Sequence, residues 1–354
     1  YRYNTTREER DNTTRKIAES WSTVAEGANG HVTQNSGIVA KTDKHSVKNI
    51  PTYRKHFMNE VIKFTNQHPT YFVQTDTIFS TESVTIMTNA GKDMMEIAMS
   101  INDGIEKPLT TAQLLEFCKN IFTGTQILHK EGYIYQDFKL ENANIDGKLM
   151  DLESIQPHDT DKINGTELTM HPILLYNLLN PDHGRIELIS TPKFNKQYDI
   201  YAAGMTCLIM LTVNLIKKSD DLIEKKNLNT LITKLYSSLQ DKRELLANKA
   251  SYKQNILLAL SKNDVNNEAN VIRKLIKTIS QNCVRHEVAN IKTAEEVKGF
   301  IQTIEREATA LCIDNTALPT ITTATNTDKE NIQSHTNKKS YRDQEPVLKK
   351  QRTV

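Results

Sequence analysis

Four polar residues between positions 137 and 151 have the types and the spacing that phosphoryl transfer requires. They are Asp137, then Lys139 two residues later, Asn142 three residues after that, and finally Asp151. An Asp-Gly pair at 146–147 is a strong two-residue turn signal, so the chain should fold back there as a tight hairpin that Asp151 closes. A solvated polar hairpin would show the same pattern in a chain with 25% charged residues, so other segments must decide.

The segment resembles the catalytic loop of protein kinases. In that family the residue matching Asp137 accepts the proton of the substrate hydroxyl, and the residue matching Lys139 steadies the transferred phosphoryl group. The resemblance implies that Asn142 and Asp151 hold Mg²⁺, for which Mn²⁺ could substitute, and that ATP is the phosphoryl donor.

A second segment, AEGANGHV at residues 25–32, is similar to the kinase glycine-rich loop. Gly27 and Gly30 match its second and third glycines, Val32 matches its valine, and Ala25 replaces the first glycine. Glycine suits such a loop because backbone N–H groups must approach phosphate oxygens closely. A plain β-turn would explain this segment equally well if it stood alone.

Lys41 ends IVAK at residues 38–41, which resembles the kinase strand whose lysine reaches the α- and β-phosphates. The same resemblance predicts that a glutamate on the following helix pairs with this lysine, and Glu60 is the candidate. Both residues could instead lie on the surface without meeting.

Two further segments follow in kinase order. GTELTMHP at residues 165–172 looks like the segment that receives the substrate, and it contributes Gly165 and Thr166. YDIYAAG at residues 198–204 is similar to the start of the buried kinase helix, where the residue matching Asp199 supports the backbone of the catalytic loop. Asp199 could also be an ordinary carboxylate near the positive end of a helix dipole.

Together these matches identify the chain as similar to a divergent eukaryotic-type Ser/Thr protein kinase. Two departures concern regulation. Gln136 replaces the arginine that contacts a phosphorylated activation loop, and residues 154–164 offer little length for such a switch, so we expect activity without loop phosphorylation. Glu153 replaces the glycine of Asp-Phe-Gly, and this carboxylate could either join the metal site or repel phosphate.

The elements that must position these residues suggest an α+β, two-lobed, kinase-like fold. β-prone pieces and one helix at 55–67 predict a small N-lobe at about 18–88, and helical periodicity predicts a larger C-lobe at about 89–308. The apolar run at 200–213 reads as a helix buried on every side. Residues 1–17 read as a flexible arm, and 309–354 as a disordered basic tail.

Composition narrows the classes of partner. A net charge of +2 argues against direct nucleic-acid binding, and no apolar run or signal peptide suggests a membrane. Four widely spaced cysteines indicate a reducing intracellular location, nuclear or cytoplasmic. The tail contains two basic clusters, Lys338-Lys339 and Lys349, Lys350 and Arg352. Their spacing resembles a bipartite signal that a nuclear import receptor binds, and the alternative is that they only make the tail soluble.

The sequence therefore predicts an enzyme that moves the γ-phosphoryl group of ATP to Ser or Thr hydroxyls of a protein substrate. A pseudokinase that binds nucleotide and acts as a scaffold is the alternative. A kinase-like phosphotransferase for small molecules is a third option, against which the substrate-segment resemblance at Gly165 and the helix start at Asp199 argue.

Overall fold

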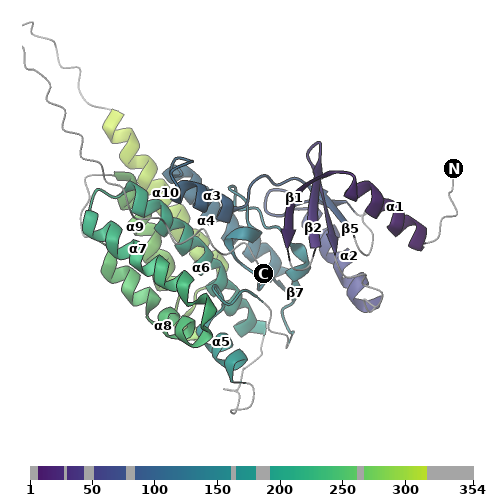
Figure 1. Ribbon diagram of the computed structural model, residues 1–354. Helices are drawn as coiled ribbons and strands as arrows, with labels where there is room; N and C mark the ends of the chain where they lie inside the picture. The colour runs from purple at the N-terminus through teal and green to yellow at the C-terminus, as the bar shows by residue number, and fades with distance from the viewer. Residues whose placement is uncertain are drawn as a thin grey trace, which may run out of the picture.

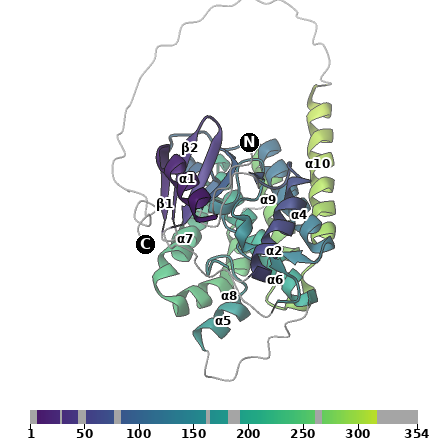
Figure 2. The same cartoon turned by 90° about the vertical axis from the view of Figure 1, so that its right-hand side faces the viewer.

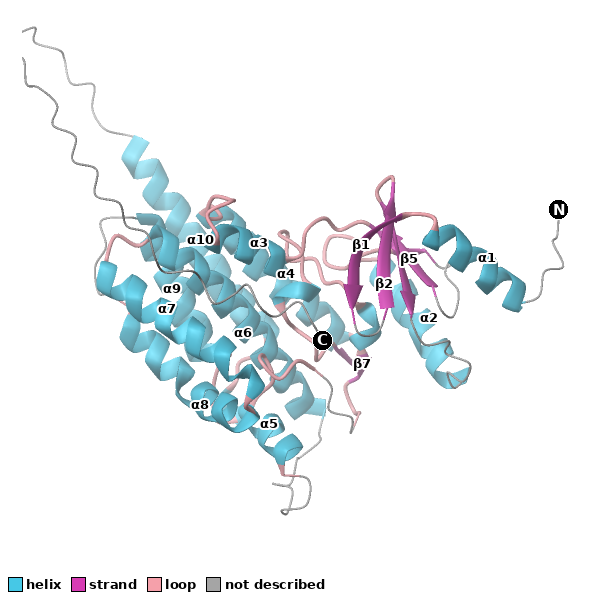
Figure 3. Cartoon of the chain, viewed as in Figure 1, coloured by secondary structure: helices cyan, strands magenta, loops and turns pink. Residues whose placement is uncertain are grey.

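The computed structural model describes residues 7–27, 30–43, 52–76, 84–160, 165–180, 192–260 and 267–316. Figure 1 shows two parts side by side, a small part built on a sheet and a larger part built from helices. Figure 3 makes the division plain, because the long strands gather at one end and the helices fill the other. The predicted mixed α+β class is therefore confirmed.

The sheet is antiparallel and has the strand order β1-β2-β3-β5-β4. Its strands are β1 (Ser22–Gly27), β2 (Gly30–Asn35), β3 (Ile38–Asp43), β4 (Thr75–Asp76) and β5 (Val84–Thr88). Ser36 and Gly37 join β2 to β3 with φ values of 48° and 82°, the conformation of a two-residue hairpin turn. This turn fixes the register that places Val32 opposite Lys41.

The N-terminal segment that we expected to be a flexible arm instead forms helix α1 (Arg7–Glu19). The helix lies against β2, β3 and β5, and Ala18 joins Ala40, Val84 and Ile86 in a small apolar cluster with Trp21 packed against it. Its composition is polar, so the helix depends on this contact with the sheet more than on its own periodicity. Residues 1–6 of the expected arm lie outside the described residues.

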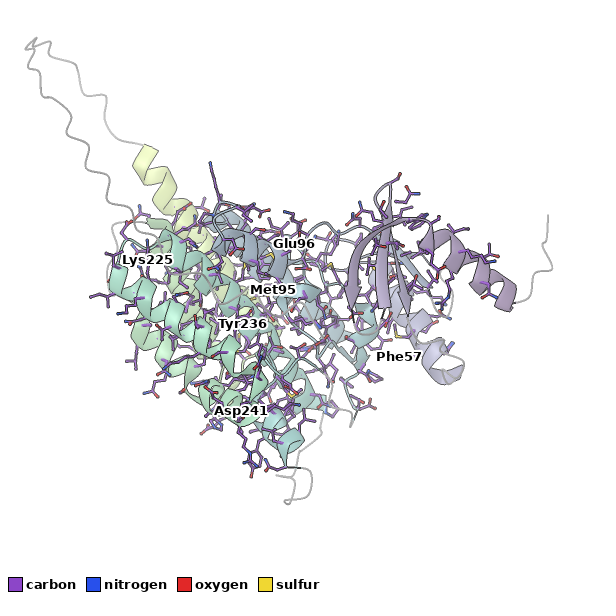
Figure 4. All side chains as sticks on the ribbon, in the orientation of Figure 1. Phe57, Met95, Glu96, Lys225, Tyr236 and Asp241 are labelled. Carbon is purple, nitrogen blue, oxygen red and sulfur yellow. The ribbon has the colours of Figure 1, made fainter. Side chains whose placement is uncertain are left out.

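Helix α2 (Thr52–Asn66) connects the sheet to the helical part. Its inner face carries Val61, which is fully buried, and two aromatic rings that contact Tyr133 in the helical part. The ring centroids of Phe57 and Phe64 lie 5.7 and 5.8 Å from that of Tyr133, and Figure 4 shows Phe57 at this junction. These contacts fix the rotation of α2 about its axis.

Helix α6 (Pro192–Lys218) is the central helix of the other part, as the sequence predicted. It packs against α3 (Met94–Asn102), α4 (Thr111–Lys130), α7 (Leu222–Ser237) and α9 (Asn267–Asn282). The helical part also contains α5 (Pro172–Leu179), α8 (Lys242–Ala259) and α10 (Ala294–Thr316), and Figure 2 shows α10 along its right edge and α5 and α8 at its bottom. By length and composition α6 could cross a membrane, but 94% of its most apolar window is buried inside the protein.

Local capping sets two helix boundaries in the helical part. A short 3-10 turn at Ser238–Gln240 separates α7 from α8, and the Asp241 carboxylate caps the start of α8. Helix α10 begins with a capping box, in which Thr293 and Glu296 bond to each other's backbone N–H, and it continues past the expected limit of 308 to Thr316. The tail with its two basic clusters lies outside the described residues.

Candidate functional site

The predicted catalytic segment follows the short strand β6 (Tyr133–Ile134), which pairs with β7 (Gln156–Pro157). A 3-10 turn at Leu140–Asn142 leads into the expected turn, where Asn144 N donates to Lys148 O at 3.1 Å. Gly147 has a φ of 73°, and a Cβ there would lie 2.6 Å from Phe117 O of α4. Glycine is therefore required at this turn both for its backbone conformation and for its close approach to α4.

The Asp137 carboxylate gathers three of the predicted residues around it. Its Oδ1 accepts from Thr166 Oγ1 at 2.7 Å, and its Oδ2 accepts from Asn142 Nδ2 at 2.8 Å. Lys139 Nζ lies 3.1 Å from the same Oδ2. With an exposed fraction of only 15%, the Asp137 side chain is held by these neighbours in one orientation and remains open on one side.

The backbone that presents Asp137 has an unusual conformation. Gln136 has a φ of 60°, which only a few per cent of non-glycine residues adopt, and Asp137 N closes a three-residue turn onto Tyr135 O at 2.8 Å. Strain of this kind persists only where neighbouring groups enforce it, and it collects at functional sites.

Asp199 supplies the group that enforces this turn. Its carboxylate is fully buried at the second turn of α6, where it accepts from Tyr135 N at 3.1 Å and from Gln136 N at 2.6 Å. His129 Nε2 is the third neighbour, at 2.8 Å. The sequence resemblance assigned this supporting position to Asp199, but no sequence signal indicated His129.

Across from Asp137, Lys41 of β3 reaches the helical part. Its Nζ lies 2.8 Å from Asp151 Oδ1 and 3.5 Å from Glu153 Oε2. Asp151 also has a positive φ, 51°, which is uncommon for a residue other than glycine. The buried Tyr135 hydroxyl packs beside it by donating to Met150 O. Burial and the nearby carboxylates of Asp151 and Asp137 raise the pKa of Tyr135 well above its usual value, so the hydroxyl remains a donor.

The expected ion pair between Lys41 and Glu60 is wrong for this structure. Glu60 is exposed and bonds to Lys63 of its own helix, with Glu60 Oε1 2.9 Å from Lys63 Nζ. This contact lowers the pKa of the Glu60 carboxyl. The physical reason is competition between partners: Lys63 lies one helical turn from Glu60, and the carboxylates of Asp151 and Glu153 lie beside Lys41 Nζ.

The glycine-rich segment forms the end of the β1–β2 hairpin. Gly27 pairs with Gly30, and Val32 lies between Ala25 and Lys41 in adjacent strands. The tip at residues 28–29 lies outside the described residues. The sheet therefore places Val32 directly beside Lys41.

The expected substrate segment packs against the catalytic turn. Gly165 has a φ of 120°, and a Cβ there would lie 2.5 Å from Gln136 O, so any side chain would push the two backbones apart. Thr169 Oγ1 donates to Phe138 O at 2.5 Å. These contacts hold Thr166 over the Asp137 carboxylate.

Lys249 of α8 supports this segment from behind, and sequence reasoning missed it. The side chain is buried, and its Nζ donates to the backbone carbonyls of Glu167 at 2.8 Å, Leu168 at 2.9 Å and Met170. Burial lowers the pKa of Lys249 well below its usual value. A lysine in an otherwise ordinary helical stretch carries no sequence signal for this role, which depends on a loop about eighty residues away.

The donor set suits a cation that is shared with a ligand. The described residues contain no group of three or more His, Cys, Asp or Glu side chains placed to hold a metal ion by themselves. Asp151 and Asn142 offer one carboxylate and one amide oxygen, which is the sparse protein contribution typical of Mg²⁺ bound together with substrate phosphates. These residues therefore fit a nucleotide-dependent Mg²⁺ site.

Comparison with known proteins gives no family assignment: no protein-family model matches the chain, and no curated protein matches it significantly. The interpretation of the site consequently depends on its residues and their geometry.

Proposed function

We propose that this protein is an ATP-dependent protein kinase of two-lobed, kinase-like architecture, which transfers the γ-phosphoryl group to Ser or Thr hydroxyls of protein substrates. The sheet-containing part would be the N-lobe and the helical part the C-lobe. The observation that carries the proposal is the environment of Asp137: Lys139, Asn142 and Thr166 converge on its carboxylate, while Lys41 and Asp151 bond to each other across the two parts.

Each residue has a role that its position supports. Asp137 can accept the proton of an incoming hydroxyl at the oxygen that now accepts from Thr166, and Lys139 can offset charge on the transferred group. Lys41 can bind the phosphates, and Gly27 and Gly30 can cover them. Asn142 and Asp151 would hold Mg²⁺, which neutralises phosphate charge when bound.

The turn at Gln136 bears on whether the proposed kinase needs phosphorylation of its activation loop. Gln136 is held by Asp199 through its backbone N–H, with its turn already formed. A loop phosphate is therefore not needed to build the catalytic turn, which supports activity without loop phosphorylation. Protein substrates and nuclear import through the tail remain proposals that depend on the sequence alone.

A scaffold that binds nucleotide without catalysis is the second candidate. The observation that favours it is the pairing of Lys41 with Glu153 as well as Asp151, because a lysine held by two carboxylates would align the phosphates for transfer less well, while the rest of the nucleotide could still bind. In the kinase the Asp137 carboxylate accepts the proton of the substrate hydroxyl, whereas in the scaffold it has no catalytic role.

The test is phosphoryl transfer from γ-labelled ATP to generic protein substrates in the presence of Mg²⁺. The Asp137→Asn variant should lose transfer by about 10²-fold or more while it keeps ATP binding, since the amide cannot accept the hydroxyl proton. Asp146→Asn is the matched control, because Asp146 is an exposed carboxylate in the same hairpin. Absence of transfer by the wild-type chain, with ATP bound, would favour the scaffold.

A further inference from the structure

A cavity of about 340 Å³ lies in the helical part, behind the segment that Lys249 supports. Helix α8 forms one wall, and the opposite side is formed by the first residue of α5, by Tyr201 of α6 and by residues 284–286, which follow α9. Helices α5 and α8 are adjacent in both Figure 1 and Figure 2. The cavity shares no lining residue with the Asp137 site.

Four of the nine residues that line this cavity have basic side chains. They are Lys249, Lys253, Arg285 and His286, and none of the lining residues carries a carboxylate. Two acidic residues that adjoin this region in the described part of the chain have other partners: Glu167 contacts Lys242, and Glu287 accepts from Asn290 Nδ2. The cavity therefore has an excess of positive charge.

The pKa values of neighbouring groups are consistent with this excess. Burial, and after it the Arg285 guanidinium, lowers the pKa of Lys253. His171 lies against the same group of residues, and its pKa falls to about 4, mainly through burial and further through the charges of Lys249 and His286. Each positively charged side chain therefore raises the free energy needed to protonate its neighbours, and a bound anion would offset this effect.

The donors in the cavity are available to a ligand. Lys253 Nζ and the His286 ring form no side-chain hydrogen bond or ion pair with the part of the chain that the structure describes. Among the described residues, the Arg285 guanidinium makes one long bond, from Nη1 to Asn290 O at 3.4 Å. Lys249 is different, since its Nζ is already bonded to three backbone carbonyls and offers no donor to a ligand.

We propose that this cavity is a binding site for a phosphate group, with Lys253, Arg285 and His286 as the direct donors. A guanidinium and an ammonium on facing walls can bond to different oxygens of a tetrahedral dianion. The volume exceeds that of a phosphate ion, which leaves room for the side chain that carries it. The ligand is then a phosphorylated Ser or Thr side chain of a peptide, with free phosphate as the other source of the same group.

The proposal does not depend on kinase activity, and its test uses the full chain. Binding is measured by anisotropy with a labelled phosphoserine peptide and with its serine counterpart, and by calorimetry with inorganic phosphate. We expect the phosphopeptide to bind, the serine peptide not to bind, and Lys253→Glu to weaken binding at least about tenfold, since one direct charge contact is reversed.

Two variants serve as controls. Arg243→Glu reverses an exposed charge on the same helix and should leave binding within about twofold of wild type, because its charge is screened from the cavity. Lys41→Met should retain phosphopeptide binding, which separates this cavity from the proposed nucleotide site. Lys253 is only partly buried, and Lys253→Gln with an unchanged melting temperature provides a folded variant if the glutamate is not tolerated.

Wild-type affinity in both Lys253 variants would overturn the proposal, as would an equal loss in Arg243→Glu or equal binding of the serine peptide. Binding of inorganic phosphate without the phosphopeptide would support the site and assign it to the free ion. Hydrogen exchange that slows at residues 249–257 and 284–286 on binding would support it independently.

Discussion

Replacing Asp199 by Asn tests whether one buried carboxylate holds the catalytic turn. The amide has nearly the same shape, so the change removes charge and one acceptor without leaving a cavity. In the best case the amide oxygen takes the place of Oδ2 and keeps the bonds from His129 and Tyr135. The NH₂ group then faces Gln136 N, which is itself a donor, at the position where the carboxylate accepted at 2.6 Å.

The magnitude follows from these three contacts. Loss of the bond from Gln136 N costs about 1.5–3 kcal/mol, because the acceptor was charged and the site is fully buried. The two remaining bonds become neutral and lose roughly 0.5–1 kcal/mol each. The expected loss in the free energy of unfolding is therefore about 2.5–5 kcal/mol.

A local effect should accompany this loss. The left-handed backbone of Gln136 costs about 1–2 kcal/mol, and without its acceptor the turn should relax toward a negative φ and move Asp137. Urea unfolding followed by far-UV circular dichroism measures the global change, and hydrogen exchange of the Tyr135 and Gln136 amides measures the local one. Asp103→Asn, at an exposed carboxylate after α3, should change stability by less than about 0.5 kcal/mol. A loss under about 1 kcal/mol in Asp199→Asn, with unchanged exchange at both amides, would refute this reasoning.

Two further predictions concern the segment that packs on this turn. Gly165→Ala should destabilise the protein by about 1–3 kcal/mol more than Gly104→Ala, since both need a positive φ but only the Gly165 Cβ meets a backbone oxygen, at 2.5 Å; equal losses in denaturant unfolding would contradict the close packing. His171, whose pKa burial lowers from 6.5 to about 4, stays neutral when folded while the unfolded chain takes up a proton below pH 6.5. Stability should therefore fall by roughly 3 kcal/mol between pH 6.5 and 4 and then level off, and His171→Asn should flatten that part of the curve by the same amount; identical pH profiles would show that His171 is not the cause.

Sequence reasoning located the turn and hairpin that carry Asp137 because their determinants are local. An Asp-Gly turn and the short distances between Asp137, Asn142 and Asp151 leave few ways for the chain to fold. The buried helix α6 was equally readable, since its apolar residues cover the whole circumference.

The contacts between distant segments could not be read in the same way. Whether Lys41 meets Glu60 depends on which other partners each side chain finds, and the structure pairs Glu60 with Lys63 and Lys41 with Asp151 and Glu153. Helix α1 was missed because its apolar contacts are few and become stabilising only against the sheet. Lys249 gave no signal for a similar reason: its acceptors are carbonyls, which the sequence does not specify.

The bond between Lys41 and Asp151 competes with ligand binding at both side chains. Phosphate oxygens would have to displace Asp151 from Lys41, and a cation would have to displace Lys41 from Asp151, before either gained its own contacts. Both side chains are partly exposed, at 22% and 34%, so the bond is worth about 0.2–1 kcal/mol. Occupancy by phosphate and by cation should therefore be positively coupled, since the first to arrive frees the partner of the second.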